Sequence, residues 1–146
     1  MLHISQFIAT ISCAIFAGAS IYINLVEHPA RMSCGTQIAA TVWAPSYRRA
    51  PVMQAPLLIL SFLAGVSAWL LGGGIMWFGG AALIGLVVPF TFIVIMPTNH
   101  QLLEPGRDLA STETRALLIK WSRLHAVRSL FGLLALVVYL ILLLQV

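Results

Sequence analysis

Four long apolar runs most constrain what this chain can fold into. They cover residues 4–26, 54–71, 75–96 and 126–144. A helix rises about 1.5 Å per residue, so about 18–20 apolar residues span the roughly 30 Å hydrocarbon core of a bilayer, and each run approaches or exceeds that length. Four buried helices of a soluble protein would instead need polar outer faces, which these runs lack. The sequence therefore predicts a multi-pass integral membrane protein.

Composition agrees with a membrane environment. Only 8% of the 146 residues are charged, whereas a soluble domain carries about 25% charged residues. The formal net charge of +4 does not indicate a nucleic-acid partner, because the chain has no basic and aromatic platform and no groove-reading helix. The first apolar run has no basic segment before it and no convincing cleavage site after it, so we expect a retained span and not a signal peptide.

The expected fold is all-α, an integral membrane antiparallel four-helix bundle. Small residues on the first three spans let helix backbones approach closely, and the same faces could support a homo-oligomer. Gly72–Gly74 predict a tight turn, and Pro29 is expected to end or bend the first helix. The fourth helix should begin near Thr112 or Thr114. We expect one transmembrane domain over residues 1–146, with spans at about 4–28, 52–72, 75–96 and 114–145 and polar connections at 29–51 and 97–113.

Basic residues predict the orientation of the chain in the membrane. The first and third connections carry arginines, whereas the second connection, around residues 72–74, carries none. Connections rich in Lys and Arg stay on the cytoplasmic side. We therefore expect both termini to face outward, and we expect the membrane to be a bacterial inner membrane.

The polar residues of the spans gather at one end of the predicted bundle. In WSRLHAVRS (residues 121–129), Trp121, His125 and Arg128 stand at i, i+4 and i+7 and so share one helix face. Because successive spans reverse direction, the polar ends of all four helices meet in one leaflet. Ionisable groups at membrane depth are costly and usually face a bundle interior or a wet cavity. We therefore expect a site there, with Arg128 paired to Glu27.

Four segments, taken in order, resemble a known family. They are INLVEHPARM, YRRAPVMQAPL, PFTFIVIMPTNHQLL and LIKWSRLHAVRS, and they look like the successive blocks of the anthrone-oxygenase-like family of small four-helix membrane proteins, long grouped as a domain of unknown function, with this chain as a bacterial member. The resemblance implies oxygenation of an anthrone-type tricyclic phenol to an anthraquinone with O2, and no cofactor beyond O2. The site residues that it implies are Glu27, His28, Arg31, Arg49, Gln54, Thr91, Thr98, Asn99, Trp121, His125 and Arg128.

The chemistry of such a reaction can be compared with the residues at this end of the bundle. Oxygenation of an anthrone needs a base, a cation beside the developing oxyanion, an aromatic wall and exclusion of water. His28 or His125 could be the base, and Arg128 or Arg49 the oxyanion partner. Trp121 and Trp43 could form the wall. We expect the partners of the chain to be membrane lipid and a small apolar aromatic substrate that arrives from the lipid.

Two other classes of function remain open at this point. His28, His100 and His125, with Glu27 nearby, could hold copper, iron, zinc or a haem if the bundle brings them together. No closely spaced pair of histidines supports such a site. The other class is a non-enzymatic lipid-binding or accessory membrane protein, for which the basic residues and small helix faces would suffice.

Overall fold

Four long helical rods make up the structure. The computed structural model describes residues 1–145, and each rod is long and apolar enough to cross a membrane. The first and third rods each contain a π-helical segment (η) with a wider turn, and the segment labelled η at the end of the second rod contains a kink at Gly72. The first rod consists of α1 (Leu2–Tyr22), η1 (Ile23–Glu27) and α2 (His28–Ser33); the second of α3 (Thr36–Ala68) and η2 (Trp69–Gly73); the third of α4 (Ile75–Gly85), α5 (Val87–Phe90), η3 (Thr91–Ile95) and α6 (Met96–Leu102); and the fourth of α7 (Thr112–Leu144).

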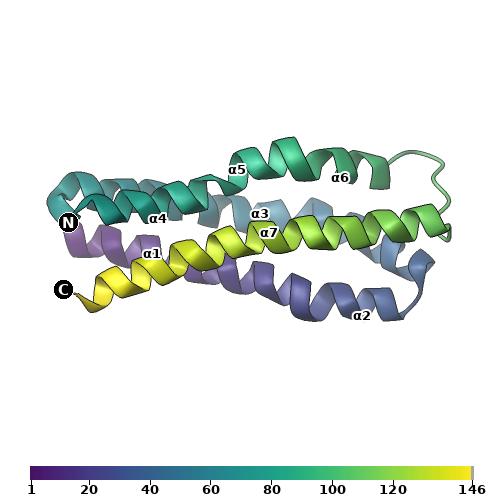
Figure 1. Ribbon diagram of the computed structural model, residues 1–146, viewed down its shortest axis with the longest axis horizontal. Helices are drawn as coiled ribbons and strands as arrows, with labels where there is room; N and C mark the ends of the chain where they lie inside the picture. Colours follow the sequence, from purple (N-terminus) through teal and green to yellow (C-terminus); the bar gives the residue numbers. More distant parts are fainter. Residues whose placement is uncertain (146) are drawn as a thin grey trace.

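The rods lie side by side in one elongated bundle. Both termini lie at one end of it, and the α2–α3 turn and the loop between α6 and α7 lie at the other end (Figure 1). α1 packs against α3 and α7, and α4 packs against the same two helices. The chain is therefore an all-α, multi-pass membrane bundle, as the sequence predicts.

The turns between rods depend on glycine and on a helix cap. Gly72 and Gly74 both have a φ of 93°, which only glycine adopts readily, so the predicted tight turn lies where the sequence placed it. α7 begins at Thr112, one of the two starts that the sequence predicted. Its first turn is capped by the Ser111 hydroxyl, which accepts a hydrogen bond of 3.1 Å from the Thr114 amide.

The polar connections at the end of the bundle opposite the termini are much shorter than the predicted ranges 29–51 and 97–113. Residues 29–51 are helical except for the turn at Cys34 and Gly35, and the third connection comprises only residues 103–111. The expected limits followed the apolar runs, whereas the helices continue into the polar residues beyond them, and Pro45, Pro51 and Pro56 all lie inside α3. Helices at membrane depth tolerate proline when neighbouring groups or a local change of helical turn supply hydrogen bonds to the backbone groups that proline leaves free.

The π-helical segments of the first and third rods each accommodate a proline. Pro29 is the second residue after η1, and Pro97 is the second residue after η3. A proline ring in a regular α-helix clashes with the carbonyl four residues earlier, here that of Leu25 or Ile93, and both of these residues lie within the π-helical segments. The wider turns therefore let both rods continue past their prolines. Such segments are frequent at functional sites, and η1 and η3 both border the cavity described below.

The half of the bundle that contains the termini is tightly closed. Its largest buried side chains include Trp77 and Tyr139, whose rings stack with centroids 5.2 Å apart. The Tyr139 hydroxyl donates a hydrogen bond of 3.4 Å to the Ser61 carbonyl. A side chain at Gly65 or Gly80 would collide with Tyr139. This half holds the four rods together, and the other half is free to contain a cavity.

Candidate functional site

A cavity of about 750 Å³ lies in the half of the bundle opposite the termini. All four rods contribute to its walls, and most of the lining side chains are apolar. The polar ends of the spans therefore meet around one space. The predicted site residues that line it are Glu27, Arg31, Trp43, Arg49, Gln54, Thr91, Asn99, Trp121, His125 and Arg128.

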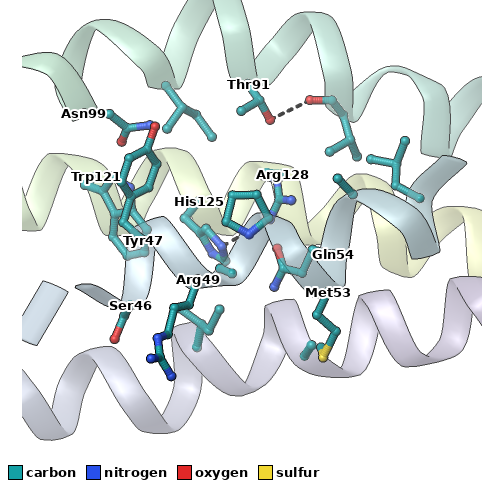
Figure 2. A pocket seen from close by; sticks show the side chains of 18 of the residues that line it. Ser46, Tyr47, Arg49, Met53, Gln54, Thr91, Asn99, Trp121, His125 and Arg128 are labelled. Atoms are coloured by element: carbon teal, nitrogen blue, oxygen red, sulfur yellow. Dashed lines mark hydrogen bonds between the residues drawn. The ribbon is translucent and has the colours of Figure 1, made fainter. Parts of the chain in front are cut away.

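Three of these residues, His125, Arg128 and Gln54, lie toward the middle of the cavity. Figure 2 shows His125 and Arg128 between Trp121 on one side and Gln54 on the other. His125 and Gln54 are buried, and one terminal nitrogen of Arg128, Nη1, lies 3.3 Å from His125 Nε2. Arg49 is exposed, so it belongs to the rim of the cavity and not to its interior.

The other nitrogen of His125 is bonded across the bundle to the first rod. Its Nδ1 lies 2.7 Å from Asn24 Oδ1. The Ser129 hydroxyl donates to the same oxygen at 2.7 Å, and the Asn24 amide nitrogen donates to the Ser122 carbonyl at 3.1 Å. Asn24 thus ties η1 to three residues of α7.

Arg128 is not paired with Glu27, so that prediction is wrong. Glu27 forms its ion pair with Arg31, four residues along the same rod, where the helical spacing places the two side chains together. Arg128 instead lies over the Phe16 ring, with 4.9 Å between its guanidinium carbon and the ring centroid. Within residues 1–145 it makes no ion pair. Its positive charge is therefore available to a ligand in the cavity.

Aromatic rings form a continuous wall beside His125. The Trp121 ring stacks on the imidazole with centroids 4.9 Å apart, and Trp43 packs edge-on against Trp121 at 5.8 Å. Tyr47 stacks on Trp43 at 5.0 Å with only 5° between the ring planes. Such a wall offers flat apolar surface to an aromatic ligand.

Four buried polar atoms of cavity-lining residues have no hydrogen-bond partner within residues 1–145. They are Arg31 Nε, Trp43 Nε1, Asn99 Oδ1 and Arg128 Nε. Leaving a buried donor or acceptor unpaired costs about 1–3 kcal/mol, so a ligand that bonds to one of these atoms would recover that free energy. The Thr91 hydroxyl is different, because it already donates to the Val87 carbonyl at 2.7 Å.

Some predicted residues do not join the cavity. His28 is buried against Trp121, with ring centroids 5.3 Å apart, and Thr98 is buried in α6, but neither lines the space. His100 is exposed on α6, whereas His28 and His125 are buried. The structure therefore does not assemble the three-histidine metal site considered from the sequence. Across residues 1–145, no three His, Cys, Asp or Glu side chains are grouped so that they could hold a metal ion.

Asn24 and Tyr47 contact the site but were not among the site residues predicted from the sequence. Asn24 is an amide within an apolar run, one helical turn before Glu27. That position was a usable signal, because an amide at membrane depth needs a hydrogen-bond partner. Tyr47 follows Trp43 by four residues, so the two rings share a helix face.

The sequence matches a family of known proteins. The family model described as anthrone oxygenase matches residues 43–138, which carry most of the cavity wall. The chain belongs to the anthrone oxygenase family. Membership, together with the four apolar helices, gives it a membrane oxygenase-like role.

Several members of the anthrone oxygenase family are similar to this chain over different lengths. Anthrone oxygenase tpcL of Aspergillus fumigatus is 29% identical over 140 residues, which cover 89% of this chain and 87% of the relative. Anthrone oxygenase nsrD of Aspergillus novofumigatus is 46% identical over 50 residues, which cover 32% of this chain and 31% of the relative. Anthrone oxygenase ptaC of Pestalotiopsis fici is 40% identical over 63 residues, which cover 37% of this chain and 45% of the relative. No solved structure matches the chain.

Proposed function

We propose that this chain is a membrane-embedded oxygenase that acts with O2 on an anthrone-like or other apolar phenolic substrate. The observation that carries the proposal is the pair His125 and Arg128, 3.3 Å apart on the wall of a mostly apolar, aromatic-lined cavity. Family membership supports the same type of reaction. The proposal requires no reactant other than the phenolic substrate and O2.

The net reaction on an anthrone consumes one O2 and releases one water. A base removes a proton from the CH2 carbon opposite the carbonyl, and the resulting anion carries negative charge on the carbonyl oxygen. That carbon forms a bond to O2, and the peroxide formed takes up a proton. Loss of water, with the second hydrogen of the carbon, leaves a second carbonyl. The carbon is oxidised and O2 is reduced to the level of water and a carbonyl oxygen.

The residues on the cavity wall suit these steps. His125 is the base, since it is a buried imidazole beside the open space. Arg128 stabilises the oxyanion, because its charge is not used in an ion pair. Trp121 and Trp43 hold the flat ring system, and the apolar lining limits water near the anion.

The walls of the cavity also favour a substrate dissolved in the membrane. Met53 and Ile59 of α3 line the cavity, as do Val88 of α5 and Phe92 of η3. All four are exposed on the outer surface of the bundle. We propose that the cavity opens to lipid between these two segments, where α3 makes little contact with α5 and η3.

Oxygen consumption by the purified chain tests the proposed function. Protein in lipid nanodiscs and an anthrone should consume O2 and form the quinone in equal amounts, faster than protein-free nanodiscs and without accumulating H2O2. Metal content of the same sample should be measured in parallel. A rate equal to that of empty nanodiscs, with the anthrone bound but unchanged, would favour a lipid-binding or accessory protein.

Removing the charge of Arg128 should impair turnover without disturbing Glu27. We expect Arg128→Met to lower kcat by roughly 10²–10³-fold, the range for loss of one oxyanion-stabilising group, and Arg128→Lys to retain more activity. Steady-state O2 uptake measures both variants, and Arg115→Met, at an exposed position, is the matched control. Activity of Arg128→Met equal to that of the control variant would contradict this role.

The orientation in the membrane is a further part of the proposal. We propose that the cavity end faces the cytoplasm and both termini face outward, because the arginines lie in the loop between α6 and α7 and in the helix segments at the cavity end, whereas the turn at residues 72–74 carries none. Cys34 is exposed at that end and should react with an impermeant maleimide only after the membrane is opened. Ile75→Cys in a Cys34→Ala background lies at the other end and should react in intact cells. The reverse labelling pattern would refute this orientation.

A further inference from the structure

The orientation of the Asn24 side-chain amide is determined by its partners. Asn24 lies in η1, which packs against α7. Its Nδ2 is 3.1 Å from the Ser122 backbone carbonyl oxygen, which can only accept a hydrogen bond. The NH2 group must therefore face Ser122, and Oδ1 must face His125 and Ser129.

That orientation determines which nitrogen of His125 carries hydrogen. Asn24 Oδ1, 2.7 Å from His125 Nδ1, can only accept, so Nδ1 must donate. A neutral imidazole carries one hydrogen, and Nε2 therefore has a free lone pair. Arg128 leads to the same result independently, because its Nη1 can only donate and lies 3.3 Å from Nε2.

The opposite arrangement fails at two points. If the amide were reversed, its oxygen would face the Ser122 carbonyl oxygen at 3.1 Å, with no hydrogen between them. If His125 carried its hydrogen on Nε2, that N–H would point at an Arg128 N–H at 3.3 Å. Each contact would be repulsive, so the two ends of the network require the same tautomer.

We propose that Asn24 is a positioning residue that holds His125 as the Nδ1–H tautomer, with Nε2 as the atom that accepts the substrate proton. This proposal rests on the proposed function and assigns the base to one atom. The Nε2 hydrogen bond to Arg128 is long and hence weak. An oxyanion in the cavity would draw the guanidinium toward itself and leave Nε2 free to take the proton.

The tautomer can be measured without any turnover. In protein labelled with ¹⁵N at histidine, the His125 signals should show a protonated Nδ1 and an unprotonated Nε2, and His125→Gln identifies these signals. In Asn24→Ala the hydrogen should move wholly or partly to Nε2. Asn24→Asp keeps an acceptor at this place and should restore the Nδ1–H signal. A wild-type His125 that carries its hydrogen on Nε2 overturns the proposal, even if the Asn24 variants fail to fold.

Kinetics supply the second readout. Asn24→Ala should lower kcat roughly 10- to 100-fold, a smaller loss than the roughly 10²–10⁴-fold rate contribution of a general base. KM should change little, because Asn24 is not on the cavity wall. Asn24→Asp should retain more activity than Asn24→Ala. Gln6→Ala removes a buried amide at the other end of the same rod and should leave both readouts unchanged.

The two readouts separate this inference from the proposed function. If the His125 hydrogen leaves Nδ1 in Asn24→Ala but the wild-type chain oxidises no anthrone, the oxygenase proposal fails and the positioning role stands. If the wild-type chain oxidises the anthrone and Asn24→Ala keeps its full kcat, the positioning role is wrong and the oxygenase proposal stands.

Discussion

Replacing His125 with glutamine should reduce O2-dependent turnover of an anthrone by roughly 10²–10⁴-fold, the usual contribution of a positioned general base. Glutamine can still donate to Asn24 Oδ1, so the contact between η1 and α7 need not be lost. The expected result is a folded variant that binds the substrate and fails to remove its proton. Steady-state O2 uptake and quinone absorbance measure the rate, and ligand-dependent quenching of tryptophan fluorescence measures binding.

The same substitution at an exposed histidine provides the control. His100 lies on the surface of α6 and does not line the cavity, so His100→Gln should keep wild-type activity. If His125→Gln also keeps full activity, His125 is not the base. If both variants lose activity equally, the loss reflects general damage or a role for His100 that the cavity does not explain.

A leucine at position 80 should destabilise the bundle far more than a leucine at position 79. A side chain at Gly80 would overlap the Tyr139 ring, whereas one at Gly79 meets no atom within 4 Å. Overpacking of a closed core costs about 1–3 kcal/mol or more, and both substitutions change helix propensity in the same way. We expect a clearly lower thermal unfolding temperature in detergent for Gly80→Leu and a nearly unchanged one for Gly79→Leu.

Unfolding measurements of these two variants also test the packing around Tyr139. Gly80→Ala should cause a smaller loss of stability than Gly80→Leu, because its single carbon requires less displacement of the Tyr139 ring. Equal unfolding temperatures for the Gly79 and Gly80 leucine variants would mean that α4 does not approach α7 through Gly80.

The bundle could be predicted because a membrane leaves the backbone few choices. In hydrocarbon every N–H and C=O must be bonded within the chain, so an apolar run of spanning length is helical. The helix limits were harder to predict. Proline at positions 29 and 97 signals a helix end in water, but η1 and η3 widen the turn and let each rod continue.

The gathering of polar residues could also be predicted, whereas their pairing could not. Reversing spans necessarily bring the polar ends of four helices to one side, and ten of the predicted residues line one cavity. Pairing depends on how each helix is rotated about its axis, which the sequence does not state. Glu27 therefore bonds Arg31 on its own rod and not Arg128, and Asn24 reaches His125 although it was not among the predicted site residues.

The exposed rim formed by Met53, Ile59, Val88 and Phe92 has a consequence for how affinity should be understood. If the cavity takes its substrate from lipid, the concentration that matters is moles of substrate per mole of lipid. An apparent KM in bulk units would then rise as more lipid is added, because the same amount of substrate is diluted in a larger hydrophobic volume. The bilayer would concentrate the substrate, so even weak binding within the cavity would be sufficient to fill it at a low total amount of substrate.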